Sequence, residues 1–223
     1  NKANVEIKSI LLENVGTSTK LDIEEEVTEK PLSAKELKKI WTAATVIDGD
    51  TKEKFIKLRA YKGSAAKVTV PAKIGKTPVR YFDCDMPEHV TSVTFESEDI
   101  TIRGSFRACK SLADKDGFIV INVGSKFILT DYIGEEDVNE IVVPDGVTEN
   151  TSYALRLKKM KKISFPKGFK VLAEHSLSNC ELLDTVNLPE GMEEIKQLAF
   201  IGCYSLKKLY IPASVNKIDS LSI

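Results

Sequence analysis

The sequence predicts an α/β solenoid in which short parallel strands stack at a fixed interval along the chain. The spacings between the successive prolines Pro144, Pro166, Pro189 and Pro212 are 22, 23 and 23, and the residues around each proline recur in the same order. A single unit of this kind cannot bury its apolar side chains alone, so successive units must stack on one another. Repeats of this period favour binding over catalysis.

Each repeat begins with a predicted strand. The residues three and one before each proline are apolar, whereas the residue between them varies: Ile141 and Val143, Ile163 and Phe165, Val186 and Leu188, Leu209 and Ile211. This alternation predicts a strand with one buried face. Because proline removes a backbone donor and ends the ladder, each strand is about three to five residues long.

The rest of the repeat is predicted to close the coil. The apolar residues three and six after the proline turn inward: Phe169 and Leu172, Met192 and Ile195, Val215 and Ile218. At a spacing of 23, Ala154, Leu157 and Met160 fill the positions of Leu177, Cys180 and Leu183. Asn150 departs from the pattern, which requires an apolar residue at that position.

The unit at 198–218 resembles the BspA-like leucine-rich repeats, whose recurring unit is Ala-Phe-x-x-Cys-x-x-Leu-x-x-Val-x-Ile-Pro-x-x-Val-x-x-Ile. The resemblance extends from about residue 61 to the end of the chain. It implies a bacterial surface or secreted protein whose repeats mediate attachment to host matrix proteins, other cells or polymers.

The regular pattern is interrupted between Leu112 and Pro144. Two apolar runs, at 118–122 and 127–129, are separated by Asn122-Val123-Gly124-Ser125, which predicts a β-hairpin inserted at about 113–134. The hairpin is also the one segment that the sequence suggests could form the side of a cleft.

Three segments are expected along the chain. Residues 1–31 contain the acidic cluster Asp22, Glu24, Glu25, Glu26 and Glu29 and are predicted to be a linker or tail. Residues 32–62 are predicted to cap the solenoid with a helix over 33–44 and a strand over 55–61, because Ser33 and Glu36 have capping-box spacing. Residues 63–223 form the solenoid, which either ends in a minimal cap after Ile218 or continues in a longer chain. Because the sequence starts with asparagine, we expect that the natural N-terminus, with any signal peptide, has been removed.

Composition and charge narrow the function. With 42% hydrophobic residues and a formal net charge of −1, the chain can form a core and is not expected to bind nucleic acid. No run reaches the roughly 20 apolar residues that span a bilayer, so we expect no membrane insertion, and we expect a monomer.

A basic stretch at 156–170 could suggest a polyanion site. Acidic residues recur one repeat later, however, so that four lysines are expected to face opposite charges on the next turn: Lys158 and Glu181, Lys161 and Asp184, Lys167 and Glu190, Lys170 and Glu193. Exposed pairs of this kind contribute about 0.2–1 kcal/mol each. We therefore interpret the stretch as a solvated ladder of charge pairs.

The residues that could act in catalysis, metal binding or glycosylation are better explained by structural roles. Cys109, Cys180 and Cys203 share one repeat position, and Cys84 lies near the equivalent position, so we predict buried thiols with no metal site. His175 and Cys180 lie on one coil and are not expected to form a catalytic dyad. Asp48-Gly49-Asp50 indicates a turn in preference to a calcium site, and Asn150-Thr151-Ser152 matches a glycosylation acceptor by chance. We expect no catalytic residue, no cofactor and no enzymatic activity.

The predicted binding surface is the row of exposed residues two and four before each proline. The residues expected to contact a ligand are Glu140, Lys162, Ser164, Thr185, Asn187, Lys208 and Tyr210, with Val142 in the same row and Tyr210 as the aromatic anchor. The leading hypothesis is a non-catalytic adhesion or protein-binding module outside the cell or on its surface. Its ligand would be a protein or glycan, such as a host matrix or cell-surface component. The alternatives are a scaffold that binds a partner of the same cell and, much less favoured, an enzyme with a cleft at the hairpin.

Overall fold

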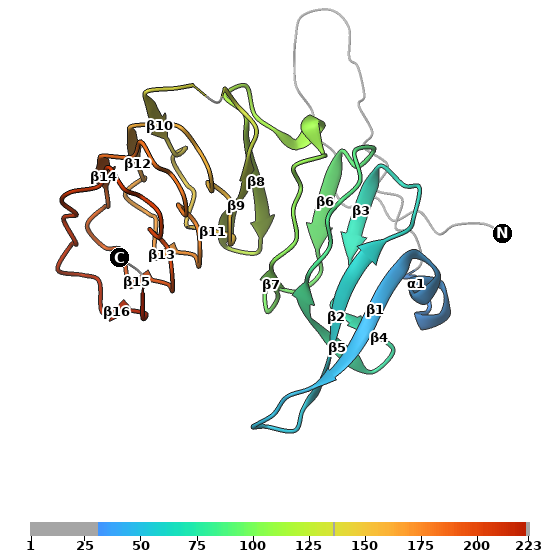
Figure 1. The fold of residues 1–223 in the computed structure, drawn as a ribbon. Coiled ribbons are helices and arrows are strands. Elements are labelled where there is room, and N and C mark those ends of the chain that lie inside the picture. The colour runs from blue at the N-terminus through green and yellow to red at the C-terminus, as the bar shows by residue number, and fades with distance from the viewer. Residues whose placement is uncertain (1–30, 136, 222–223) are drawn as a thin grey trace, which may run out of the picture. The chain divides into compact units, whose positions relative to one another are not determined.

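Short parallel strands in two ladders form the body of the protein (Figure 1). The computed structural model describes residues 31–135 and 137–221, so all but the last residue of the expected linker at 1–31 lies outside the described residues. The first ladder contains the pre-proline strands β10 (Glu140–Val142), β12 (Lys162–Ser164) and β14 (Thr185–Asn187). Ile141 pairs with Ile163, and Ile163 pairs with Val186, as the proline spacing predicts.

A second parallel ladder runs along the opposite part of each turn. Its strands are β9 (Lys126–Tyr132), β11 (Glu149–Asn150), β13 (Val171–Leu172), β15 (Glu194–Ile195) and β16 (Lys217–Ile218), in this order. The residue six after each proline lies in these strands, and Leu172 and Ile195 are fully buried. The stacked parallel strands confirm the solenoid predicted from the repeat, although the inward-turning residues form a sheet that the sequence pattern did not predict.

The N-terminal turns follow the same plan with longer strands. β3 (Lys67–Val70) pairs in parallel with β6 (Ser92–Phe95), while β2 (Lys54–Tyr61), β5 (Thr77–Phe82) and β7 (Thr101–Ile102) form the other parallel set. The two-residue strand β4 (Lys73–Ile74) pairs antiparallel with β5.

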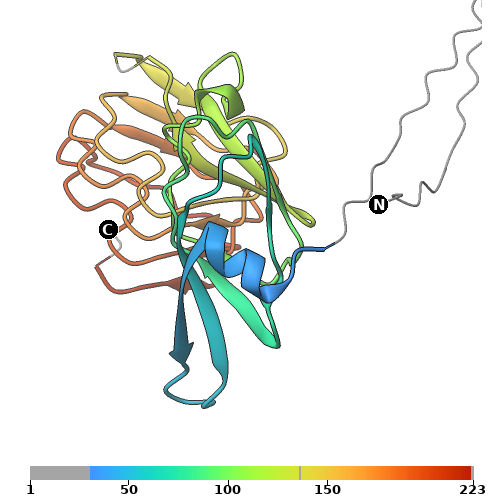
Figure 2. The same ribbon diagram turned by 90° about the vertical axis from the view of Figure 1, so that its right-hand side faces the viewer.

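The predicted helix is shorter than expected. Helix α1 spans Ala34–Ile40, and Trp41 begins strand β1 (Trp41–Ile47), which pairs antiparallel with β2. The β1–β2 pair extends away from the rest of the fold in both views (Figures 1 and 2). The prediction of helix to Ala44 was wrong because Thr42, Thr45, Val46 and Ile47 are β-branched and favour strand. Trp41 is fully buried against Tyr61 and Phe82, which anchors the start of this strand.

The hairpin consists of β8 (Phe118–Val123) and β9, which pair antiparallel around the turn at Gly124. It follows a short 3₁₀ helix at Lys110–Leu112. Because β9 also pairs in parallel with β11, the hairpin is the first member of the second ladder.

The hairpin also separates two hydrophobic clusters. Phe118, Leu129 and Tyr132 pack with the C-terminal repeats, whereas Ile119, Ile121, Val123 and Ile128 pack with the N-terminal turns. Within the N-terminal cluster, Phe82 and Phe106 stack with ring centroids 5.5 Å apart. One strand pair therefore contributes apolar side chains to both clusters.

The turn between Pro144 and Pro166 does not align with the next turn at the regular spacing of 23 residues. Leu155 N–H donates to Ser176 O, just as Leu177 N–H donates to Ala199 O one turn later, so Leu155 occupies the position of Leu177. Leu155 is fully buried, whereas Leu157 is 60% exposed. The turn between Pro144 and Pro166 is one residue shorter than each of the next two turns. The missing residue falls after Lys158, so Lys158 occupies the repeat position that holds Cys180 in the next turn.

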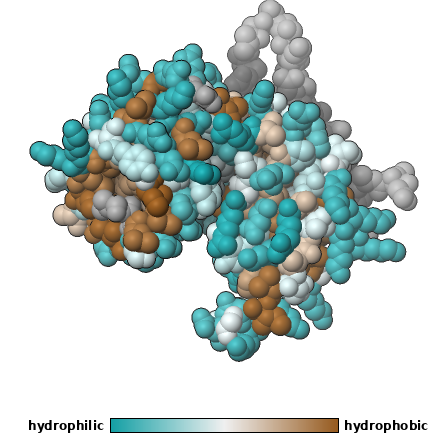
Figure 3. All heavy atoms as spheres, in the orientation of Figure 1, coloured by the Kyte–Doolittle hydropathy of each residue, from teal (hydrophilic) through white to brown (hydrophobic). Residues whose placement is uncertain are grey.

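The final turn is the least regular. Lys208–Tyr210 is not part of the three-stranded sheet β10-β12-β14, contrary to the prediction of a fourth strand there. Leu209 and Ile211 are only half-buried, so less apolar burial holds this segment in place than holds the earlier strands. Ile218 and Leu221 are exposed, and hydrophobic surface gathers at this end of the repeats in Figure 3.

Candidate functional site

The candidate site is the solvent-facing surface of β10, β12 and β14. In-register pairing places Glu140, Lys162 and Thr185 in one row across the three strands, and Val142, Ser164 and Asn187 in a second row. The intervening residues Ile141, Ile163 and Val186 point into the core and are buried. The strand alternation therefore presents five of the predicted ligand-binding residues together on one face.

Polar side chains on this face are linked across all three strands. Glu140 Oε1 accepts from Lys162 Nζ at 2.9 Å and from Ser164 Oγ at 3.2 Å, and Asn187 Nδ2 donates to Ser164 Oγ at 2.9 Å. The hydrogen bond from Lys162 is the main cause that lowers the pKa of Glu140. The links restrict the rotamers of these side chains before any ligand binds.

The residues two before Pro144 and two before Pro212 carry exposed apolar groups. Val142 on β10 is 60% exposed, and Tyr210 on the last turn is 74% exposed. Lys208 and Tyr210 follow the same sequence positions as the other site residues but lie outside the sheet, so the structure does not place them in the hydrogen-bonded rows. The surface as a whole offers donors, acceptors and both charge signs, a combination suited to binding polar ligands through many weak contacts.

The cysteines are buried, and three of them make a common contact. The thiols of Cys180 and Cys203 donate to the carbonyl oxygens of Leu155 and Leu177 at 3.2 and 3.1 Å, and Cys109 contacts Pro87 O at 3.2 Å. Each thiol therefore satisfies a carbonyl of the preceding turn. Burial raises the pKa of Cys180 and Cys84 to about 12, which disfavours the reactive thiolate.

His175 and Cys180 face different surroundings. The His175 ring stacks on exposed Tyr153 with centroids 5.0 Å apart, and Arg156 lies 5.5 Å from the same tyrosine ring. The Cys180 thiol instead points to the carbonyl of Leu155. The repeat pattern gives no signal for Tyr153, because its ring contact with His175 comes from the next turn and its backbone has a positive φ.

The predicted lysine ladder is only partly present. Lys170 Nζ lies 3.0 Å from Glu193 Oε1, as expected. Among the described residues, Lys161 and Lys167 make no ion pair with Asp184 or Glu190, and Lys158 is buried with its Nζ 5.1 Å from the centre of the Tyr132 ring. The shortened turn moves Lys158 inward, which explains its departure from the ladder.

Two polar motifs have structural roles. Asp48 Oδ1 accepts from the backbone N–H groups of Asp50 and Thr51, which lowers the Asp48 pKa and confirms a turn. Asn150 is buried, its Oδ1 accepts from Ala173 N–H at 3.0 Å, and its Nδ2 donates to Ser176 Oγ at 2.5 Å. An amide that is buried and hydrogen-bonded through both its oxygen and its nitrogen is not accessible for glycosylation. No group of three or more metal-ligating side chains in the described part of the chain could hold a metal ion.

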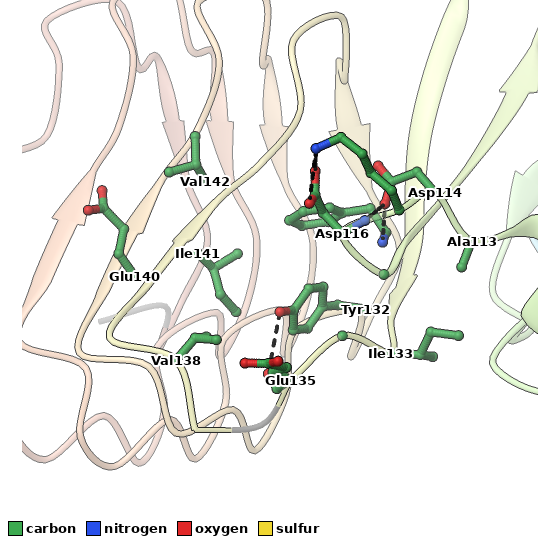
Figure 4. A pocket seen from close by; sticks show the side chains of 14 residues that line it. Ala113, Asp114, Asp116, Tyr132, Ile133, Glu135, Val138, Glu140, Ile141 and Val142 are labelled. Atoms are coloured by element: carbon green, nitrogen blue, oxygen red, sulfur yellow. Dashed lines mark hydrogen bonds and ion pairs between the residues drawn. The ribbon is translucent and has the colours of Figure 1, made fainter.

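A cavity of about 630 Å³ lies beside β10, and the sequence provides only an indirect signal for it. Residues 113–118 and 132–135, which lead into and out of the hairpin, line one side, and Glu140, Ile141 and Val142 line the other (Figure 4). The cavity lies beside the hairpin, where the sequence suggests a cleft.

Comparison with known proteins identifies the repeat type. Residues 131–222 match the model of the BspA type leucine rich repeat region in six copies. No curated protein matches the sequence. Within residues 31–135 and 137–221, no helix combines the length and the apolar character needed to cross a bilayer.

The solved structures that match the chain include the following three. A leucine-rich repeat protein of T. pallidum is 26% identical, with a TM-score of 0.44 over 48% of this chain and 53% of that one. A leucine-rich repeat protein of Bacteroides capillosus is 24% identical, with a TM-score of 0.44 over 48% and 87%. A leucine rich cell surface protein of Faecalibacterium prausnitzii is 13% identical, with a TM-score of 0.44 over 79% and 82%. The chain thus spans about half the length of the first of these proteins.

Proposed function

Because residues 131–222 carry BspA-type leucine-rich repeats, we propose that the protein is a non-catalytic binding module of a bacterial cell-surface or secreted protein. It acts by adhesion or protein–protein interaction through the exposed face of β10, β12 and β14. In this proposal residues 32–62 cap the solenoid and residues 1–31 tether it.

The observation that carries the proposal is the chain of hydrogen bonds that links the side chains of Glu140, Ser164 and Asn187 across three in-register strands. Repeat proteins commonly bind along extended surfaces of this kind. Immobilising a free side chain at an interface costs about 0.5–1.5 kcal/mol. Side chains that are already hydrogen-bonded to one another have less conformational entropy to lose when a ligand binds. The linked side chains therefore reduce the entropic cost of binding a polar ligand.

In this proposal Tyr210, one repeat after Asn187, supplies an exposed aromatic anchor. A tyrosine ring offers a large apolar surface and a hydroxyl, and tyrosine is enriched among residues that dominate binding energy. A protein loop or a glycan fits both the ring and the hydrogen-bonding groups of the strands. A host matrix or cell-surface component is the ligand class that we propose.

The test is binding of the purified chain to an immobilised panel of matrix proteins, mucins and glycans at low and high salt. The triple variant Lys162→Ala/Asn187→Ala/Tyr210→Ala is compared with Tyr204→Ala, which removes an equally exposed tyrosine from the coil segment of the same turn. We expect saturable binding that persists at high salt, is lost in the triple variant and is kept in Tyr204→Ala. Absence of binding, or equal binding by the triple variant, would reject the proposal and direct the search to partners of the same cell.

A further inference from the structure

The first ladder of strands is interrupted once, and the interruption leaves a strand edge without a partner. β3 and β6 form one pair, and β10, β12 and β14 form the next sheet, in which β10 is the outermost strand on the side of the hairpin. β6 ends at Phe95 and β10 begins at Glu140, so about two repeat periods separate these strands. The hairpin connection replaces the strand that a regular turn would add between them.

Backbone groups of β10 point toward this gap. Asn139 O accepts from Lys162 N–H at 2.9 Å, and Val143 N–H donates to Ser164 O at 2.9 Å, so these alternate residues face β12. In an extended strand the N–H and C=O of one residue point to the same edge, and successive residues alternate. The backbone groups of Glu140 and Val142 therefore point away from β12, and no described strand pairs with them.

The cavity beside the hairpin adjoins this edge of β10. Figure 4 shows Val138, Glu140, Ile141 and Val142 along one side and the loop with Asp114 and Asp116 on the other. Its volume of about 630 Å³ is enough for several residues of an extended peptide. Tyr132 and Phe118 contribute aromatic surface to its lining.

The charged residues that line the cavity are mostly acidic. Four carboxylates line the cavity, from Asp114, Asp116, Glu135 and Glu140, against a single ammonium group, that of Lys115. Two carboxylates already have cationic partners, since Asp116 pairs with Lys115 at 3.1 Å and Glu140 with Lys162 at 2.9 Å. Buried Lys158 adds one further cation near the Tyr132 ring. Burial, together with Glu135, Asp116 and Asp114, raises the pKa of Tyr132, which is consistent with negative potential in this region.

We propose that the open edge of β10 and the adjacent cavity bind an extended, basic segment of another protein, which adds to the sheet as a strand. The segment forms backbone hydrogen bonds with Glu140 and Val142 and places Lys or Arg side chains near Glu135 and Asp116. Strand addition fits because an unpaired edge presents donors and acceptors at two-residue spacing. A basic segment fits because the carboxylates outnumber the cations of the lining.

This site adjoins the proposed binding face, and Glu140 and Val142 belong to both. It uses the edge of β10 and the hairpin connection, whereas the proposed ligand contacts the surface of all three strands. The two proposals can therefore fail independently, and the experiment distinguishes them.

The test is fluorescence anisotropy of labelled octapeptides with the full chain. The probe is (Lys-Val)₄, and the comparison peptides are (Gln-Val)₄ and a (Lys-Val)₄ that is N-methylated at every backbone amide. The double variant Asp116→Asn/Glu135→Gln is compared with Glu181→Gln/Glu190→Gln, which neutralises two exposed carboxylates outside the cavity. Denaturation midpoints verify that all variants are folded.

We expect saturable binding of (Lys-Val)₄ that weakens at least about tenfold with either comparison peptide and with the cavity variant, a difference of about 1.4 kcal/mol. Binding should stay within about twofold in the control variant and in Asn187→Ala, which alters only the face. Absence of saturable binding to the unmodified chain, or equal binding of the N-methylated peptide, would overturn the proposal. Equal binding by the cavity variant would overturn it as well.

Discussion

Asp131 on β9 accepts the backbone N–H of Phe106 through Oδ2 at 2.8 Å, while its Oδ1 accepts from Ser105 Oγ at 3.0 Å. Phe106 belongs to the N-terminal cluster, whereas the neighbouring Tyr132 packs with the C-terminal repeats. One buried carboxylate thus joins the N-terminal turns to the strand that starts the second ladder.

Replacement of Asp131 by alanine should destabilise the fold by about 2–3 kcal/mol, because it leaves the buried N–H of Phe106 without an acceptor. Asp131→Asn keeps an acceptor for Phe106 and a donor for Ser105, so most of the stability should remain. Urea denaturation of the three proteins at neutral pH measures the difference, and equal losses in both variants would contradict this role.

Asp131 should also make stability depend on pH. Burial raises the pKa of this carboxyl above its ordinary value of 3.8 in the folded protein. A group with a raised folded-state pKa contributes its full stability below the unfolded pKa and loses it as pH rises through the folded value. The free energy of unfolding, relative to that of Asp131→Asn, should therefore fall as pH increases from about 3.8 upward. A flat difference across this range would show that the pKa is not raised.

Gly104 should tolerate no side chain. A Cβ at this position would overlap the backbone carbonyl of Cys84, which belongs to the rigid core and cannot shift freely. Gly104→Ala should lower the free energy of unfolding by at least about 2 kcal/mol. The matched control Gly168→Ala has open space around its Cβ and should stay within about 0.5 kcal/mol of the parent. Similar midpoints for both variants would disprove the close approach.

The proline spacing and apolar alternation were sufficient to predict the solenoid, the register of β10, β12 and β14, and the buried cysteine position. They did not predict the second ladder, because two-residue strands such as β13 and β15 leave too short an alternation to recognise. The position of Leu155 could have been found by counting from the preceding proline, since Leu155 follows Pro144 at the same interval as Leu177 follows Pro166. Helix α1 was extended too far because Trp41 continues the helical spacing of Leu37 and Ile40, although the β-branched residues after it favour strand.

The candidate site was less completely predicted. The alternation placed Glu140, Lys162 and Asn187 on one face, but the hydrogen bonds between them depend on rotamers, which a repeat pattern does not specify. The cavity beside β10 depends on how the hairpin connection folds back, and loop geometry of this kind is set by tertiary packing.

Asn150 should stabilise the repeats from inside. Its amide bridges Ala173 N–H and Ser176 Oγ of the next turn, so Asn150→Ala should cost about 2 kcal/mol of unfolding free energy. Asn216→Ala, at an exposed position two turns from Ala173, serves as the control and should change stability by less than about 0.5 kcal/mol. Comparable stability of Asn150→Ala and the parent protein would exclude the bridge as a stabilising contact.

The four thiols should be unreactive in the native state. Burial raises the pKa of Cys180 to about 12 and that of Cys109 to about 11, so few thiolates exist near neutral pH. We expect a thiol reagent to label the native protein at least about 100-fold more slowly than the denatured protein. Prompt labelling of Cys180 or Cys203, located by peptide mass spectrometry, would contradict their burial in the cysteine position.

We propose that the face of the repeats carries the ligand, and two tyrosines of the last turn allow a direct test. Tyr210 is 74% exposed at the position one repeat after Asn187, whereas Tyr204 is 81% exposed on the coil segment. The measurement is the Kd of the first panel ligand found to bind, for Tyr210→Ala and for Tyr204→Ala. We expect at least about tenfold weaker binding for Tyr210→Ala and no change for Tyr204→Ala. Unchanged affinity in Tyr210→Ala, or a greater loss in Tyr204→Ala, would contradict it.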